Sequence, residues 1–363
     1  MKMSEMTKEF KEEMLGREKH HLERYVGEGA QPEQLFEAYA KIKTLEDWSR
    51  EFSSIANKFE DAGDAIEDPM VKAHNYLSAS LYHHIGGLAL YEDTEEKKQG
   101  YYAGLRAYQK AAKYFWAPAE RVEIPFRSTT LKGFFRKAPE TNRTPCVISI
   151  HGADASGLVE GHYMTNFFLH KGISTLEFDL PGQYEARFEG LYMEPSEFEK
   201  AISAGVDYLE TVSDVEANKI GLIGSSFGGY IAARTAAVEK RLKACISVGG
   251  FYGLDEFTYM PGAVLHLQND MNVTPAQWPE ETKKYTLDGI IDKMTCSLLV
   301  VNGTADATSP NSQVVKLYDN ARCPKDIKLY EGVGHSAWYW KKDALLYIAD
   351  WAWIKLQSKV LGS

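Results

Sequence analysis

The sequence has few cysteines and no long apolar run. Its four cysteines among 363 residues are far apart and lack the paired or metal-type spacings of a disulfide framework or a zinc site: Cys146, Cys245, Cys296 and Cys323. They are predicted to be buried free thiols, which suits a reducing cytosol. No stretch approaches the ~18 apolar residues of a membrane span, and the charged N-terminus lacks the apolar segment of a secretory signal. We therefore predict a cytoplasmic protein that has no membrane partner.

The sequence also lacks an excess of positive charge. Lysine and arginine total 41 against 51 acidic residues, giving a formal net charge of -10, and no dense basic run offers a footprint for phosphate backbones. Nucleic-acid binding is not expected. The histidine pairs His20-His21 and His83-His84 do not have the i, i+4 spacing of a helical zinc site, and no H-E-x-x-H occurs. We expect neither a metal nor a cofactor.

The chain length predicts two structural units. A chain of 363 residues exceeds the size at which one core usually stops growing. Residues 1–117 show helical periodicity, with apolar residues at three- and four-residue spacings in segments 32–62, 69–91 and 94–115. Asp68 is expected to cap the second segment, and Asp93 with Glu96 resembles a capping box for the third.

From residue 118 the pattern changes to strands. Residues 122–126 and 131–136 are expected to form a hairpin, and six mostly short apolar runs follow, at 146–151, 174–179, 219–225, 244–250, 297–303 and 326–332. Several are separated by helix-length segments, which predicts βαβ crossovers and a mostly parallel sheet covered on both faces. Residues 251–294 are longer than an ordinary connection and are expected to form an insertion over the strand ends.

One G-x-S-x-G motif occurs, at Gly224-Ser225-Ser226-Phe227-Gly228. An apolar strand runs into it and a helix-like stretch follows, so Ser226 is predicted to lie on a tight strand-to-helix turn and to act as a nucleophile. A serine hydroxyl needs a neighbouring base. Downstream, one strand ends in Gly303-Thr-Ala-Asp306 and the next in Gly332-Val-Gly-His335. His335 is the predicted base and Asp306 the acid that orients it, in the order Ser, Asp, His.

Further candidates surround this constellation. Backbone N–H groups of Phe227 and Ala153 are the expected oxyanion donors, since residues 151–154 follow a predicted strand. Tyr184 is a candidate pocket residue. Glu256 is a candidate second carboxylate from the insertion, with a solvated loop charge as the alternative. His83 and His84 are candidates to face the substrate if the helical region is a lid, with core or interface packing as the alternative.

Several motifs together resemble a known group of α/β-hydrolases. They are the helical N-terminal region, G-S-S-F-G-G at the elbow, A-C-I-S-V-G-G-F after it, G-T-A-D and G-V-G-H. This group includes dihydroxypseudooxynicotine hydrolase of nicotine breakdown, fungal polyketide-shortening hydrolases and related esterases. The resemblance implies an α/β-hydrolase fold in residues 118–363 and a helical cap domain in residues 1–117. It also implies a homodimer and a functional glutamate in the insertion, for which Glu256 is the nearby candidate.

The sequence therefore predicts a cofactor-independent serine hydrolase acting on a carbonyl group of a small-molecule substrate. The leading hypothesis is hydrolysis of a carbon-carbon bond next to a ketone in an aromatic or polyketide-like compound. A carboxylesterase acting on small esters is the alternative, because one triad serves both reactions. A third hypothesis is a ligand sensor that keeps the hydrolase scaffold and signals through the lid.

Overall fold

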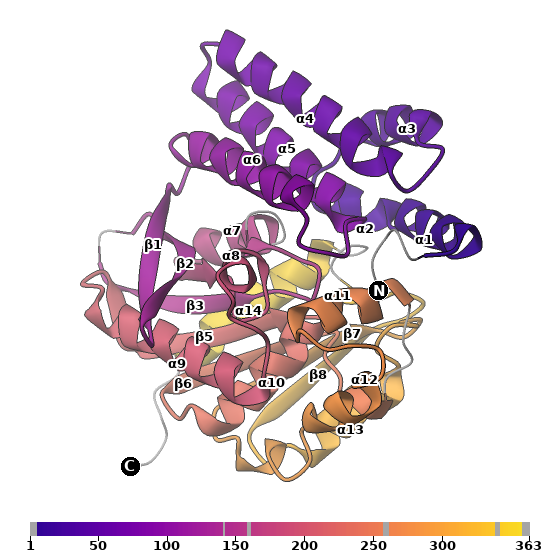
Figure 1. Ribbon diagram of the computed structural model, residues 1–363. Helices are drawn as coiled ribbons and strands as arrows, with labels where there is room; N and C mark the ends of the chain where they lie inside the picture. The colour runs from indigo at the N-terminus through magenta and orange to yellow at the C-terminus, as the bar shows by residue number, and fades with distance from the viewer. Residues whose placement is uncertain (1–5, 141, 158–160, 257–260, 338–341, 358–363) are drawn as a thin grey trace.

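A computed structural model describes residues 6–140, 142–157, 161–256, 261–337 and 342–357 (Figure 1). Before residue 119 the described chain is helical. The helices are α1 (Lys8–His20), α2 (Leu22–Gly27), α3 (Pro32–Lys41), α4 (Asp47–Ala65), α5 (Pro69–Leu88) and α6 (Glu95–Ala112). They lie above the sheet in Figure 1, with α4, α5 and α6 packed side by side.

The helices depart from the sequence prediction at two points. Segment 32–62 is two helices, because residues 42–46 interrupt it between α3 and α4. The side chain of Asp68 caps α5 as predicted, accepting hydrogen bonds from the N–H groups of Met70 and Val71. The capping box with Asp93 was wrong: Thr94 caps α6 by accepting from the N–H of Lys97, while the Asp93 carboxylate is bound by Arg187. Arg187 donates to both carboxylate oxygens of Asp93, a bidentate arrangement that a helix terminus does not offer.

After residue 118 the strands of the described residues form one sheet of eight, in the order β1-β2-β4-β3-β5-β6-β7-β8. The predicted hairpin is β1 (Ala119–Phe126) and β2 (Thr129–Arg136), which pair antiparallel. β2 pairs antiparallel with β4 (Ser174–Phe178), and all remaining pairs are parallel. Those strands are β3 (Thr144–Ile150), β5 (Val215–Ser225), β6 (Leu242–Val248), β7 (Ser297–Gly303) and β8 (Lys325–Tyr330). All six predicted runs are strands, and the mostly parallel sheet is confirmed.

Helices cover both faces of this sheet, also as predicted. Successive residues of a strand point to opposite faces, so Ile148 packs in the cluster that contains α9 (Pro195–Thr211) and α10 (Phe227–Val238). Val147 packs on the other side with α7 (His162–His170) and α14 (Lys342–Gln357). The four cysteines are buried free thiols, as expected.

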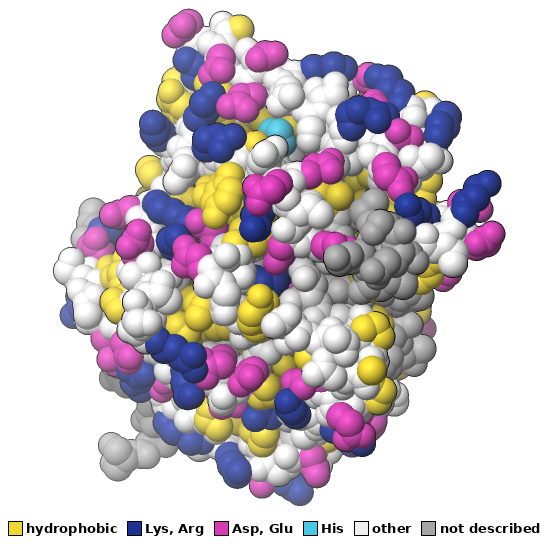
Figure 2. Space-filling model, in the orientation of Figure 1, with side chains coloured by type: hydrophobic (Ala, Val, Ile, Leu, Met, Phe, Trp, Pro, Cys, Tyr) yellow, Lys and Arg dark blue, Asp and Glu magenta, His cyan; other side chains and the backbone are white. Residues whose placement is uncertain are grey.

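The connection from β6 to β7 forms the predicted insertion. Its described residues contain α11 (Pro261–Asp270), α12 (Trp278–Glu281) and the 3-10 turns η3 (Leu254–Glu256), η4 (Thr282–Lys284) and η5 (Ile291–Lys293). α8 (Tyr184–Phe188) follows β4, and α13 (Asn311–Asn320) follows β7. Among the described residues no helix is long and apolar enough to cross a membrane. The face shown in Figure 2 carries interspersed acidic and basic side chains.

Candidate active site

Ser226 occupies the turn between β5 and α10. Its backbone angles, φ 57° and ψ -122°, lie in a region that non-glycine residues rarely adopt, which indicates a strained turn that holds the side chain in place. Glycines make the turn possible: a Cβ at Gly228 would lie 2.6 Å from the carbonyl oxygen of His151, and one at Gly224 would collide with the backbone of Gly228. Ser226 therefore stands on the elbow that the motif predicts.

The structure brings the three predicted triad residues together. The Nε2 atom of His335 lies 2.8 Å from the Oγ atom of Ser226, and its Nδ1 atom lies 2.7 Å from Oδ2 of Asp306. A carboxylate only accepts hydrogen bonds, so Nδ1–H donates to Asp306 and Nε2 is left to accept the serine proton.

Asp306 is held in its ionised form. Burial alone would raise the pKa of this carboxyl, but the adjacent His335 and the hydrogen bonds that the carboxyl accepts lower it below its usual value. Among these bonds are those from the backbone N–H groups of Thr308 at 2.7 Å and Ser309 at 2.8 Å. The side chain of Asp306 has no exposed surface, whereas that of His335 is 23% exposed. The histidine can therefore exchange protons with a bound substrate while its partner stays fixed.

Residues 151–154 form a loop beside the serine. A Cβ placed on Gly152 would lie 3.8 Å from Oγ of Ser226. Gln183 donates from Nε2 to the carbonyl oxygens of Gly152 (3.1 Å) and His151 (3.3 Å). The Tyr184 hydroxyl donates to the carbonyl oxygen of Asp154 at 2.9 Å. We call residues 151–154 the oxyanion loop.

One candidate oxyanion donor, Phe227, follows Ser226 directly in the chain, and the other, Ala153, belongs to the oxyanion loop. Phe227 is the first residue of α10, where backbone N–H groups have no partner within the helix. Ala153 stands in the oxyanion loop, between Gly152 and Asp154. The role of these two N–H groups as oxyanion donors stays a prediction. His151 is buried, burial lowers its pKa to about 4, and it fits a structural role.

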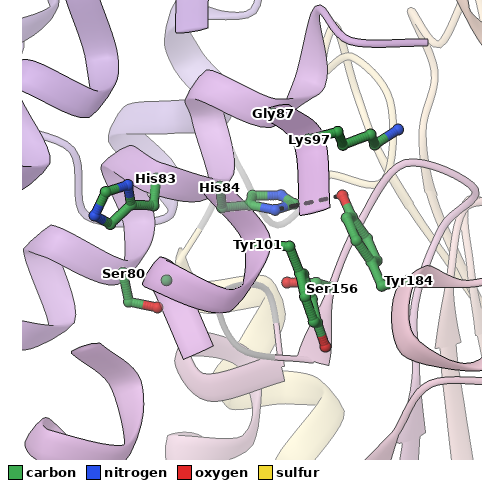
Figure 3. A pocket seen from close by; sticks show the side chains of 9 residues that line it. Ser80, His83, His84, Gly87, Lys97, Tyr101, Ser156 and Tyr184 are labelled. Atoms are coloured by element: carbon green, nitrogen blue, oxygen red, sulfur yellow. Dashed lines mark hydrogen bonds between the residues drawn. The ribbon is translucent and has the colours of Figure 1, made fainter. Parts of the chain in front are cut away.

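The structure joins two of the four pocket candidates and separates the others. Nδ1 of His84 on α5 lies 3.5 Å from the hydroxyl of Tyr184, and both side chains line a cavity between α5, α6 and the catalytic part (Figure 3). Ser156 lines the same cavity, which is roomy enough for about one water molecule. His83 contributes to the wall, but its ring is turned the other way.

Glu256 lies on the surface of the described structure. It ends η3, accepts a hydrogen bond from Nε2 of Gln313 at 2.9 Å and forms an ion pair with Lys316 at 2.6 Å. Its side chain is 46% exposed. This arrangement matches the solvated charge weighed as the alternative, and it gives no support to a role in substrate binding.

Sequence reasoning missed the residues that hold the loops in place. Gln183 was not singled out, although it follows a strand in the turn Pro181-Gly-Gln183, the only local signal that it carries. Arg187 is buried and binds Asp93 and Asp270 from two distant segments, for which no local pattern exists. Within the described parts of the chain no cluster of histidine, cysteine, aspartate and glutamate could hold a metal ion.

Comparison with protein families gives two matches. Residues 39–254 match the family described as "Esterase FrsA-like", and residues 184–349 match the dienelactone hydrolase family. Among curated proteins, 2,6-dihydropseudooxynicotine hydrolase of Paenarthrobacter nicotinovorans is 33% identical over 211 residues, covering 57% of this chain and 56% of that protein. The α/β hydrolase ucsC of Acremonium sp is 26% identical over 297 residues, covering 73% of this chain and 57% of that protein. The matches thus span a little over half the length of these relatives.

Comparison with solved structures covers nearly the whole chain. The crystal structure of a 2,6-dihydroxy-pseudo-oxynicotine hydrolase superposes with a TM-score of 0.78 and 25% identity, over 92% of this chain and 95% of the other. The structure named AbyA5 is 14% identical with a TM-score of 0.69, which bears on the fold alone. The α/β-hydrolase fold inferred from the motifs is confirmed.

Proposed function

Because the chain belongs to the FrsA-like esterase family and is an enzyme of the α/β-hydrolase type, we propose that it is a serine hydrolase with a Ser226-His335-Asp306 triad. The observation that carries this proposal is the unbroken line of hydrogen bonds from serine through histidine to a buried carboxylate, 2.8 Å and 2.7 Å long. A ligand sensor would not need a base within bonding distance of a strained serine, so this geometry favours catalysis.

In the proposed mechanism Ser226 attacks a substrate carbonyl while His335 takes its proton. Asp306 stabilises the imidazolium that forms. The N–H groups of Phe227 and Ala153 bind the oxyanion, and removing one such donor typically costs about 3 kcal/mol of transition-state stabilisation. His335 then protonates the leaving group, and water releases the acyl group from Ser226 by the reverse sequence of proton transfers.

We further propose that the bond cleaved is a carbon-carbon bond next to a ketone in an aromatic or polyketide-like small molecule. Supporting this choice, Tyr101 and Tyr184 stack with ring centroids 4.9 Å apart, and the Tyr184 hydroxyl binds the oxyanion loop, so an aromatic surface lies beside this loop. A carbon leaving group departs readily only as a stabilised enolate, and an enclosed pocket with oriented donors favours the tautomer that places charge on oxygen. The FrsA-like esterase family instead favours a carboxylesterase, which remains the second candidate.

A matched pair of substrates separates these two candidates. An aryl ester and a β-diketone that share one acyl group are compared by kcat/KM. The carbon-carbon assignment expects the diketone to be turned over at least as well as the ester. An ester preference above about a hundredfold, roughly 2.7 kcal/mol in barrier, assigns the protein as a carboxylesterase.

The nucleophile is tested independently of the bond type. Ser226→Ala should fold normally yet lose turnover of both substrates and labelling by a fluorophosphonate. Ser225→Ala is the matched control, since Ser225 directly precedes the nucleophile and its hydroxyl donates to that of Ser336 at 3.3 Å. Turnover that survives in Ser226→Ala would end the serine-hydrolase proposal.

Residues 1–117 are proposed to act as a cap that walls the pocket and excludes water. In support, the apolar cluster of the N-terminal helices continues into the catalytic part through Phe134, Tyr184 and Leu265. The homodimer and the cytoplasmic location stay predictions, to be checked by light scattering and by cell fractionation.

A further inference from the structure

The corner between α1 and α2 lies against the proposed active site. Arg24 at this corner forms an ion pair with Asp154 of the oxyanion loop, with 2.7 Å between Nη1 and Oδ2. Lys342, at the start of α14, donates to the carbonyl oxygen of Gly27 at 2.5 Å. His21 lies between the two helices. Burial lowers its pKa most, and the charges of Arg24, Arg17 and, to a smaller extent, His335 lower it further. The corner between α1 and α2 is therefore joined to the oxyanion loop through Arg24.

Arg17 on α1 has guanidinium donors that no group in the described structure uses. Its side chain is partly exposed, but the Nε and Nη1 atoms have no solvent contact and no hydrogen-bond partner among the described residues. A guanidinium stays charged at physiological pH, and burying its donors without a partner is costly. Such an arrangement is favourable only when something else supplies the acceptor.

The acids around Arg17 are engaged elsewhere. The carboxylate oxygens of Glu18 accept hydrogen bonds from Tyr91 at 3.0 Å and Tyr25 at 3.2 Å. Burial raises the pKa of Glu18, which favours its neutral form. Asp154 is paired with Arg24, which also binds Glu28 at 3.0 Å. The positive charge of Arg17 therefore has no bonded counter-ion among the described residues.

We infer that Arg17 binds a carboxylate group of the substrate, so that the enzyme acts on carbonyl compounds that also carry a carboxylate. This inference rests on the proposed function, since it assigns a substrate class to the same site. A carboxylate accepts charge-assisted hydrogen bonds from guanidinium N–H groups, which are about twice as strong as bonds between neutral groups. It would supply both the missing acceptor and the missing negative charge.

Gly262 provides a way to test this inference without removing the charge. It is buried in the first turn of α11, and the Nη1 atom of Arg17 lies where a Cβ at this position would stand. An alanine there would push the flexible end of Arg17 aside. Alanine is the better helix former, so Gly262→Ala should fold while displacing the guanidinium.

The experiment measures a preference ratio, kcat/KM for a mono-p-nitrophenyl ester of glutaric acid divided by kcat/KM for the same compound with its free carboxylate methylated. The wild-type enzyme should prefer the carboxylate. Arg17→Gln and Gly262→Ala should each lower the ratio at least about thirtyfold, mainly through KM for the carboxylate. Arg17→Lys, which keeps a positive charge, should recover part of the preference.

Two control variants separate this role from other causes. Arg24→Gln should lower kcat for both esters and leave the ratio unchanged, because Arg24 holds the oxyanion loop rather than the substrate. Arg50→Gln removes a surface arginine paired with Asp47 and Glu51 and should change nothing. A wild-type ratio near one, or equal losses on both esters in Arg17→Gln, would overturn the inference. Failure of wild-type Ser226 to react with a fluorophosphonate would instead contradict the proposed function.

Discussion

Arg187 is predicted to hold the N-terminal helices onto the catalytic part. Its guanidinium donates twice to Asp93, which precedes α6, at 2.7 and 2.8 Å, and also to Asp270 at the end of α11. A further N–H donates to the carbonyl oxygen of Gly182 at 2.7 Å. One side chain that is only 4% exposed thus joins the helical region, the segment after β4 and the insertion. Replacing it by glutamine removes the charge and most of these bonds.

The loss of stability expected for Arg187→Gln depends on the buried carboxylates that are left without their partner. Breaking a buried ion pair by removing one partner usually costs about 3–5 kcal/mol, because the other charge stays buried without compensation. Here Asp270 is 1% exposed, and burial raises its pKa against the opposing charges of Arg187 and Lys97. Without Arg187 it can take up a proton, which limits the penalty. We therefore expect the contact between the helical region and the catalytic part to lose about 3 kcal/mol of stability, near the lower end of this range.

Native-state trypsin cleavage after Lys97 provides the assay. This lysine lies in α6 and is only 3% exposed, so cleavage there requires release of the helical region. When opening is fast relative to cleavage, the rate follows the population of the open form. A loss of about 3 kcal/mol then gives roughly a hundredfold faster cleavage. Arg50→Gln is the control. If Arg187→Gln were cut no faster than this control, the ion cluster would not be what holds the helical region in place.

Three further predictions concern the triad, a buried acid and the cap. Asp306→Asn should lower kcat by about four orders of magnitude with little loss of stability, because the histidine loses its correct tautomer; a loss below tenfold would contradict the orienting role. Burial raises the pKa of Glu177 in β4 to about 7 from 4.5, so its contribution to stability is present below about pH 4.5 and is lost as pH rises through 7. Glu177→Gln should therefore gain up to about 3 kcal/mol over wild type in urea denaturation between pH 5 and 8; parallel pH profiles would refute this. Deleting residues 1–117 should abolish turnover of the native substrate, and a soluble truncation with unchanged kcat/KM would show that these helices are not a cap.

The local sequence determined the strands, most helices and the positions of the three triad residues. Ser226, Asp306 and His335 each follow a strand, and a parallel sheet brings the carboxyl ends of its strands to one edge. Their meeting therefore follows from topology, and topology follows from the alternation of strands and helices. The capping role of Asp68 could also be predicted from the sequence, because a helix cap binds N–H groups only two or three residues away.

Only the tertiary structure decided which polar side chains meet across distant segments. Asp93 binds Arg187 instead of capping its own helix, Glu256 pairs with Lys316 at the surface, and His84 faces Tyr184 while the adjacent His83 turns away. Neighbouring residues on a helix point about 100° apart, and ion pairs form between groups separated by tens to hundreds of residues. No local pattern encodes these distances, so the contacts that shape the pocket arise only when the helical region packs against the sheet.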